Sequence, residues 1–160
     1  MKKMTAVFAV FALSLLVAGS AFAQASATHN LNLAVNAVTK ISTSAGAINL
    51  TINDGVAGVD ALTSVNGSGD YSITHNKNTN MKITAQIDSN MPTDITLKAD
   101  LASVKGTSEG QKTLSTTAVD VVTAIAKGAD ATKTATYTLE ALASAGEWSG
   151  ARTVTLTLTD

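Results

Sequence analysis

Hydrophobic and polar positions alternate along much of this chain, and the clearest case is the stretch from Thr153 to Thr159. Val154, Leu156 and Leu158 alternate there with threonines. A period of two places successive side chains on opposite faces of a strand, and these residue types favour extended backbone. The stretch therefore predicts a half-buried β-strand whose apolar face, Val154, Leu156 and Leu158, belongs to a core or to an acceptor sheet.

Similar alternation recurs in short segments that are separated by Gly, Asn, Asp and Ser. The predicted strands are 31–37 with a continuation to 41, 48–53, 59–65, 71–75, 81–88, 95–101 and 134–141. The predicted loops and turns are 53–55, 66–69, 76–80, 103–110 and 143–150, where turn-forming residues cluster. Residues 118–125 fit both a Val-rich strand and a helical spacing, and the all-β surroundings favour the strand.

The number and spacing of these segments predict the fold class. Eight or nine short strands at intervals of about 8–12 residues, without a convincing helix, indicate a β-sandwich or a barrel. Because each strand has one polar and one apolar face, antiparallel sheets packed face to face are favoured. We expect an all-β antiparallel sandwich of about 8–9 strands.

The first 23 residues have the pattern of a secretory signal peptide. Met1-Lys2-Lys3 is a basic start, residues 6–18 are almost entirely apolar, and Ala21-Phe22-Ala23 gives the small-x-small cleavage pattern. A membrane anchor is the alternative, but the apolar run is short for about 30 Å of hydrocarbon. We therefore expect cleavage before Gln24, a single mature domain over 24–160, and a secreted or cell-surface location, reached through the periplasm in a Gram-negative cell.

Loss of Lys2 and Lys3 makes the formal net charge of −1 more negative by two. A mildly acidic domain with scattered charges argues against nucleic acid as a partner and against anionic membrane surfaces. No later stretch resembles a membrane span, so no membrane insertion of the mature chain is expected. The chain has no cysteine, so its stability has to come from packing and hydrogen bonding without disulfides.

The residues that could carry chemistry are few. His29 and His75 are too few for a zinc site, which needs three or four ligands, and no G-x-S-x-G motif is present. Asp54, Asp60 and Asp70 could belong to a calcium-binding loop, but they lack the dense spacing of such loops, and solvated turn residues are the favoured interpretation. No catalytic residue, metal ligand or cofactor is predicted.

Trp148 is the one aromatic residue in a predicted loop. It could contact a ligand, such as a sugar ring or a partner, because exposed Trp is enriched at binding sites. The alternative, which is favoured, is that it folds back and covers the end of the sandwich.

Both ends of the predicted domain resemble a known group of proteins. Residues 30–36 and 153–159 look like bacterial pilin-type sandwiches, and the stretch from Tyr137-Thr138-Leu139 to Trp148-Ser149-Gly150 is similar to the closing region of the spore coat protein U group. The resemblance implies an incomplete immunoglobulin-like sandwich that is completed by an N-terminal strand of the next subunit. Residues 24–38 would contain that donor strand, with Leu31, Leu33, Val35 and Ala37 at the subunit interface.

The function that this resemblance implies is a structural subunit of an extracellular bacterial filament or surface coat. Its partners would be further copies of the chain, through strand exchange, and an export chaperone. The alternative is a monomeric exported binding module for a glycan, a surface or a peptide, and an enzyme is the third class. Whether residues 24–38 pair within their own subunit or with a neighbour stays open from the sequence, because their apolar face needs a groove in either case.

Overall fold

The computed structural model describes residues 26–44 and 46–160, so the signal peptide predicted for residues 1–23 lies outside the described residues. The chain divides into two units, one ending at Ala34 and one spanning Val35–Asp160. In the first unit, residues 26–34 have no regular secondary structure. The second unit contains all the strands described below.

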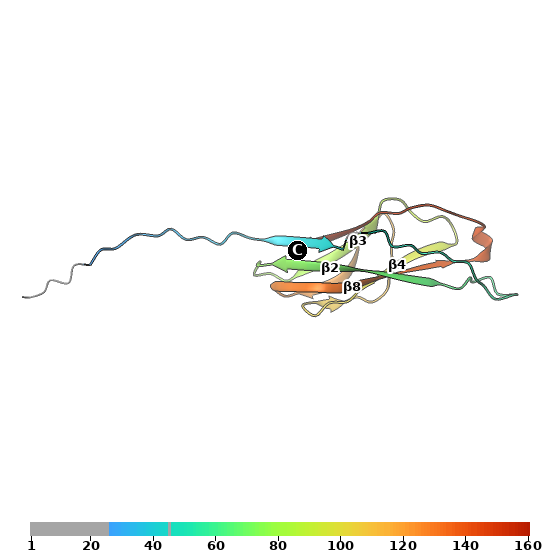
Figure 1. Cartoon of the computed structure of the whole chain (residues 1–160), viewed down its shortest axis with the longest axis horizontal. Coiled ribbons are helices and arrows are strands. Elements are labelled where there is room, and N and C mark those ends of the chain that lie inside the picture. The colour runs from blue at the N-terminus through green and yellow to red at the C-terminus, as the bar shows by residue number, and fades with distance from the viewer. Residues whose placement is uncertain (1–25, 45) are drawn as a thin grey trace, which may run out of the picture. The chain divides into compact units, whose positions relative to one another are not determined.

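The second unit is an all-β antiparallel sandwich, as predicted (Figure 1). Its described residues form nine strands and one short 3-10 helix, η1 (Ala143–Ala145). The five-stranded sheet has the order β1-β2-β8-β4-β6, and the four-stranded sheet has the order β5-β7-β3-β9. The strands are β1 (Thr39–Thr43), β2 (Val65–His75), β3 (Met81–Ile87), β4 (Ile95–Leu101), β5 (Thr107–Ser108), β6 (Lys112–Thr113), β7 (Val119–Ile125), β8 (Gly128–Ala141) and β9 (Val154–Thr159).

The core consists of the inward faces of the two sheets, and alternation within each strand supplies it. In β3 the buried residues are Met81, Ile83, Ala85 and Ile87, and β4 follows the same rule. The other main core residues are Tyr71, Ile73, Leu97, Ala99, Leu101, Leu114, Val121, Val122, Ile125, Ala135, Tyr137 and Leu158. Since burial of one large aliphatic side chain is worth about 1.5–3 kcal/mol, this set can hold the fold without disulfides.

Several strand predictions are confirmed. Strands predicted for 81–88, 95–101 and 153–159 correspond to β3, β4 and β9. The ambiguous stretch 118–125 is strand β7, and the strand predicted for 134–141 extends back to Gly128 in β8.

Other predictions are wrong. Residues 66–69 were expected to form a loop but lie within β2, because Gly67 and Gly69 make room for side chains from another segment. The strand expected at 59–65 is reduced to isolated bridges, Gly55 to Leu62 and Ala61 to Leu142. Among residues 103–110, expected to be a loop, Thr107–Ser108 forms the short strand β5.

The structure assigns no strand to 31–37 or to 48–53, although both alternate as clearly as β9. Leu31, Leu33 and Val35 are 74%, 86% and 90% exposed. Within the described residues neither stretch has a sheet partner, and alternation alone does not provide one.

Register shifts interrupt two of the strand ladders, one in the β2–β8 pair and two in the β3–β7 pair. In the β2–β8 pair, Tyr71 lies opposite Lys133 and Ile73 opposite Asp130, so that one extra residue of β8 is accommodated beside Ser72. The bulged strand there contains Thr132 at φ 53°, and β7 contains Ala124 at φ 53° beside the irregularity of the β3–β7 pair. Such bulges reverse which side chains face inward on either side of them.

No helix in the part of the chain that the structure describes has the length and apolar character needed to cross a membrane.

Candidate functional site

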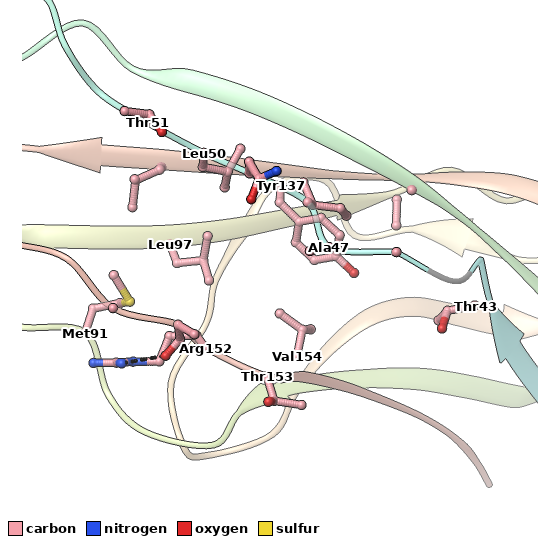
Figure 2. A pocket seen from close by; sticks show the side chains of 18 of the residues that line it. Thr43, Ala47, Leu50, Thr51, Met91, Leu97, Tyr137, Arg152, Thr153 and Val154 are labelled. Carbon is pink, nitrogen blue, oxygen red and sulfur yellow. Dashed lines mark hydrogen bonds between the residues drawn. The ribbon is translucent and has the colours of Figure 1, made fainter.

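A groove opens along one edge of the sandwich, between the segment that follows β1 and the segment that leads into β9 (Figure 2). Its volume is about 660 Å³. Figure 2 shows Leu50 and Tyr137 on one side of the space and Arg152 and Val154 on the other. Met91, Leu97, Ala135 and Leu139 also line the groove. The groove therefore reaches the inner face of the five-stranded sheet.

The first wall of the groove is formed by residues 46–51 of the segment 46–53, which packs across the glycines of β2. The Ile48 and Leu50 side chains lie so close to Gly67 that a Cβ added there would be 2.6 Å from Ile48 Cγ2 and 2.8 Å from Leu50 Cδ2. The Ile48 side chain also covers Gly69. Ile48 and Leu50 thus occupy the space that side chains of β2 would otherwise fill.

The backbone of this wall has no sheet partner among residues 26–44 and 46–160. Ser44 is the last residue tied to β2, through a 2.8 Å hydrogen bond from its N–H to Asp70 O. Within the described residues, no hydrogen bond involves the backbone N–H or C=O groups of residues 46–53. An extended backbone with unpaired donors and acceptors is a template for another strand.

The opposite wall leads into β9, a strand whose backbone is hydrogen bonded to a neighbouring strand on one edge only in the described structure. Strand β9 pairs with β3 and is the edge strand of its sheet in the described structure, as β1 is of the other sheet. The predicted acceptor residue Val154 lines the groove. Leu156 and Leu158 point into the core opposite Ala85 and Ile83 of β3, with Leu158 more deeply buried than Leu156. The backbone edge of β9, together with Val154, is thus what this wall offers to a ligand.

Trp148 lies at the groove, where it contacts two neighbours in sequence. Gly150 packs against its ring, and the Arg152 guanidinium lies 5.1 Å from the ring centroid, within the range of a cation–π contact. Arg152 is held in turn by a 3.0 Å hydrogen bond from its guanidinium to Asn90 O. Trp148 is 37% exposed, and its contact with a ligand stays a prediction.

The root of the predicted donor segment is held by Asn76, whose backbone N–H donates a hydrogen bond to Val38 O at 3.2 Å and whose side chain makes two more. Asn76 accepts a hydrogen bond from Val38 N–H at 2.7 Å and donates one to Asn36 O at 2.9 Å. Val35 and Ala37, two of the predicted interface residues, line a smaller hollow with residues 76–79. The predicted donor residues of the second unit are therefore exposed at the end of the domain where β1 begins.

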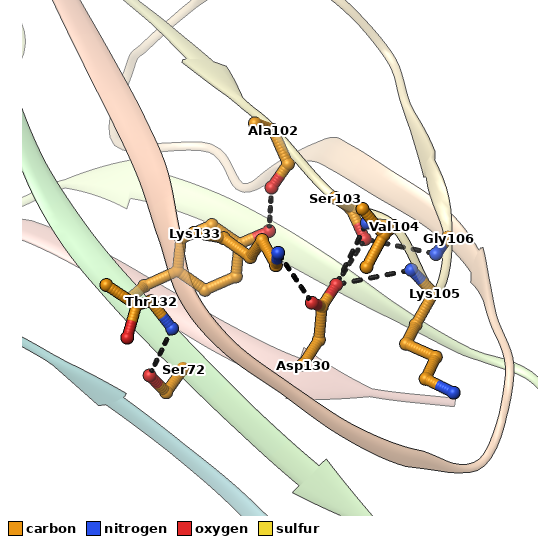
Figure 3. Close-up of polar contacts among 10 residues, drawn as sticks. Ser72, Ala102, Ser103, Val104, Lys105, Gly106, Asp130, Thr132 and Lys133 are labelled. Atoms are coloured by element: carbon orange, nitrogen blue, oxygen red, sulfur yellow. Dashed lines mark hydrogen bonds and ion pairs between the residues drawn. The ribbon is translucent and has the colours of Figure 1, made fainter.

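Asp130 is a buried carboxylate at the centre of a hydrogen-bonded cluster that the sequence did not indicate (Figure 3). Its Oδ2 accepts hydrogen bonds from the N–H groups of Val104 and Lys105 at 3.0 and 3.2 Å, and from the Ser103 hydroxyl at 3.2 Å. Lys133 Nζ lies 3.3 Å from the other oxygen. Asp130 therefore anchors the loop after β4 to β8.

Two opposing effects act on the pKa of the Asp130 carboxyl. Burial raises it, but the hydrogen bonds from Val104, Lys105 and Ser103 and the Lys133 ammonium together outweigh burial and hold the pKa below its usual value. The carboxyl is 2% exposed and fully occupied by these internal partners. The cluster is a structural anchor, since it has no open side at which a substrate could bind.

The candidate metal ligands are dispersed. His29 is exposed, whereas His75 is buried in β2 with Nε2 3.0 Å from Ala126 O and with Nδ1 unpartnered. Asp54 accepts a hydrogen bond from Gly55 N–H, and Asp60 accepts one from Ser144 N–H, as turn residues do. Within residues 26–44 and 46–160, no group of three or more His, Cys, Asp and Glu side chains is placed to hold a metal ion.

Comparison with known proteins adds no assignment to this site: no family model, no curated protein and no solved structure matches the chain.

Proposed function

We propose that this chain is a structural subunit of an extracellular bacterial filament or surface coat, and that subunits assemble by strand donation. The observation that supports the proposal is the pairing of two features. One is a groove between residues 46–51 and the segment that leads into β9, with unpaired backbone in residues 46–53 and along the free edge of β9. The other is an exposed N-terminal stretch in which Leu31, Leu33 and Val35 alternate with polar or small residues.

The energetics favour such an exchange. Burial of Leu31, Leu33 and Val35 in the groove of another copy would contribute roughly 4.5–9 kcal/mol, at about 1.5–3 kcal/mol for each side chain. Backbone hydrogen bonds to the two walls would add to this. Asn30, Asn32 and Asn36 would lie on the opposite face of the strand, where they can stay in water.

Before assembly, the groove exposes apolar side chains and strand edges. Such a surface promotes unwanted pairing, so an export chaperone that covers it in transit is part of the proposal. Export itself depends on the predicted signal peptide of residues 1–23.

Negative-stain electron microscopy of the purified mature protein, residues 24–160, tests the proposal. We expect filaments or coat-like assemblies for the unmodified protein and for Asn32→Asp, whose charge stays on the outer face. Leu33→Asp should abolish them because it would place a charge in the groove. Monodisperse monomers of the unmodified protein at all concentrations would contradict the proposal.

A peptide experiment tests the groove directly. Deletion of residues 24–38 should leave an open groove, and a synthetic peptide of residues 29–37 should bind to it. Trp148, the only tryptophan in the chain, lies at the groove and reports binding through its fluorescence. The same peptide with Leu33→Asp is the matched control. A truncated protein that stays soluble, is as stable as residues 24–160 and binds neither peptide would show that residues 24–38 have no role in assembly. That result would contradict strand donation.

A monomeric exported binding module is the second candidate, and Trp148 is the observation that favours it. The indole ring is partly exposed at the groove beside the Arg152 guanidinium, an arrangement that can hold a planar or sugar ligand. Trp148→Ala separates the two candidates. It should abolish binding to a glycan or surface if the module hypothesis is right, and it should leave filaments in place if strand donation is right.

A further inference from the structure

Two six-residue stretches of the chain have the same pattern. Residues 31–36 read Leu-Asn-Leu-Ala-Val-Asn, and residues 48–53 read Ile-Asn-Leu-Thr-Ile-Asn. Both place large aliphatic residues at the first, third and fifth positions and asparagine at the second and sixth. The first stretch is the exposed N-terminal segment, and the second is one wall of the groove.

The direction of the second stretch follows from its contacts. Ile48 touches Gly67 and Gly69 of β2, and Leu50 touches Gly67, so residues 48–53 run antiparallel to β2 and continue the direction of β1. Strand β9 runs the opposite way. Residues 152–154 lie across the groove from residues 47–51, whereas Asp160 is paired with Lys77, close to the end of β2 that meets Thr39.

We propose that residues 31–36 of a second copy lie beside residues 48–53, parallel and in register with them, and antiparallel to β9. This inference rests on the proposed function and specifies its geometry. The side chains of Leu31, Leu33 and Val35 then enter the groove beside Ile48, Leu50 and Ile52. Asn32 and Asn36 face outward beside Asn49 and Asn53, where amide side chains of adjacent strands can hydrogen bond to each other.

Other registers match less well. A shift of one residue turns the apolar face of the donor outward. A shift of two residues keeps the apolar face inward but places Asn32 beside Thr51 and separates both asparagine pairs. An antiparallel arrangement centred on Leu33 and Leu50 also places Asn32 beside Thr51, and it would run parallel to β9.

The partner has to be a second copy. In register, Asn36 would lie beside Asn53, past Leu50, which contacts Gly67 of β2, whereas Thr39 pairs with His75. The eight residue steps of β2 from Gly67 to His75 span about 26 Å. Asn76 holds Asn36 and Val38 at the start of β1 in their own subunit. The three residues from Asn36 to Thr39 can span only about 11 Å. A single chain therefore cannot form this pairing with itself.

The geometry also determines the type of assembly. The donor leaves its own subunit at the end where β1 begins, and the acceptor groove extends to Thr51, away from that end. Each subunit thus joins the next through two different surfaces. Such a heterologous contact continues as an open chain of subunits unless its rotation closes a ring.

Disulfide trapping tests the register. Because the chain has no native cysteine, only the introduced cysteines can form a disulfide. Mature Asn32→Cys is mixed with mature Asn49→Cys under mild oxidation, and dimers are measured on a non-reducing gel. Adjacent strands lie about 4.8 Å apart, within the Cα separation that a disulfide spans, whereas the residue two positions along is about 8 Å away. The matched control mixes Asn32→Cys with Thr51→Cys, whose site lies on the same outer face.

We expect the Asn32→Cys and Asn49→Cys pair to give at least tenfold more dimer than the control pair. Leu33→Asp added to the donor should remove that dimer, since its formation requires docking. Equal dimer in both pairs, or more with Thr51→Cys, would overturn the register while leaving strand donation intact. If neither pair exceeds the Leu33→Asp background and no filaments form, the proposed function fails and this inference fails with it.

Discussion

The Tyr71 hydroxyl donates a hydrogen bond of 2.6 Å to the carbonyl oxygen of Ala102, across the five-stranded sheet from β2 to the end of β4. Burial, with a further contribution from the Asp130 carboxylate, raises the pKa of Tyr71 to about 12. Burial also raises the pKa of Tyr137. Both tyrosines of the chain therefore ionise late in the folded protein.

Alkaline titration should reveal this. An unfolded tyrosine ionises near pH 10, so the stabilisation from neutral, buried Tyr71 is fully present below that pH. It is lost as the pH rises through the folded pKa of about 12. Absorbance at 295 nm should show little tyrosinate at pH 10.5 in the folded protein and about three-quarters ionisation in denaturant.

Tyr71→Phe is the matching variant. It leaves the Ala102 carbonyl without its hydroxyl partner, and it should lower the free energy of unfolding at pH 7 by about 1–2 kcal/mol in urea. The loss of stability between pH 10 and pH 12 should also become shallower. An unchanged alkaline profile would show that Tyr71 does not control it.

Asp130→Asn should destabilise the domain by about 2–4 kcal/mol at pH 7, because it removes the charge that Lys133 pairs with and weakens the hold on the loop after β4. The folded pKa of Asp130 is lowered, so its stabilisation is present above the unfolded value of about 3.9 and is lost as the pH falls through the folded pKa.

The checking measurement is urea unfolding at pH 7 and pH 3. The difference in free energy of unfolding between the unmodified protein and Asp130→Asn should be smaller at pH 3 than at pH 7. Asp120→Asn is the control, because it removes only a partly exposed ion pair with Lys82 and should cost less than about 1 kcal/mol. Equal effects of the two substitutions would contradict the role given to Asp130.

Gly67→Ala should disturb the groove without touching its backbone edges. The added Cβ would lie 2.6 Å from Ile48 Cγ2 and 2.8 Å from Leu50 Cδ2, so these side chains would have to move. We expect a cost of about 1–3 kcal/mol from overpacking. Peptide 29–37 should also bind more weakly to the protein lacking residues 24–38, as read from Trp148 fluorescence. Ser68→Ala, on the exposed face of β2, should change neither quantity.

Ala124→Gly should stabilise the protein by about 0.5–1 kcal/mol. Ala124 is exposed and has φ 53°, a left-handed conformation that glycine adopts without a Cβ penalty. The control is Ala129→Gly, at an exposed position of β8 without positive φ, which should be destabilising by a similar amount. The measurement is the melting temperature of both variants relative to the unmodified protein. Equal shifts of the same sign would refute the conformational argument.

The sequence predicted best the strands whose inward side chains fill the core between the two sheets. An example is β3, with Met81, Ile83 and Ile87, which pairs with a strand on each edge. The prediction failed at Gly67 and Gly69, because the reason for glycine there is contact with Ile48 and Leu50, which a local pattern does not contain. The sequence also predicted strands at 31–37 and 48–53 as firmly as at β9. Alternation shows which side chains share a face of a strand, but it does not show whether the backbone edges of that strand find a partner.

Asp130 was missed for a different physical reason. Along β8, the polar residues that alternate with Ala135 and Tyr137 face outward, and Asp130 falls on their parity in the sequence. The bulge beside Ser72 reverses that parity, so Asp130 lies opposite the inward-facing Ile73 and becomes buried. One inserted residue thus converts an expected surface carboxylate into the anchor of a loop.

The attachment of Asn36 and Val38 to Asn76 has a mechanical consequence. Tension applied through the N-terminal segment enters the sandwich at Asn76 and at the first residue of β1, which pairs with His75. The ladder bonds between β1 and β2 run perpendicular to the strands, so a pull along β1 loads all five residue pairs in shear at once and does not unzip them in turn. A subunit pulled at this point should resist extension much more strongly than one pulled at right angles to β1.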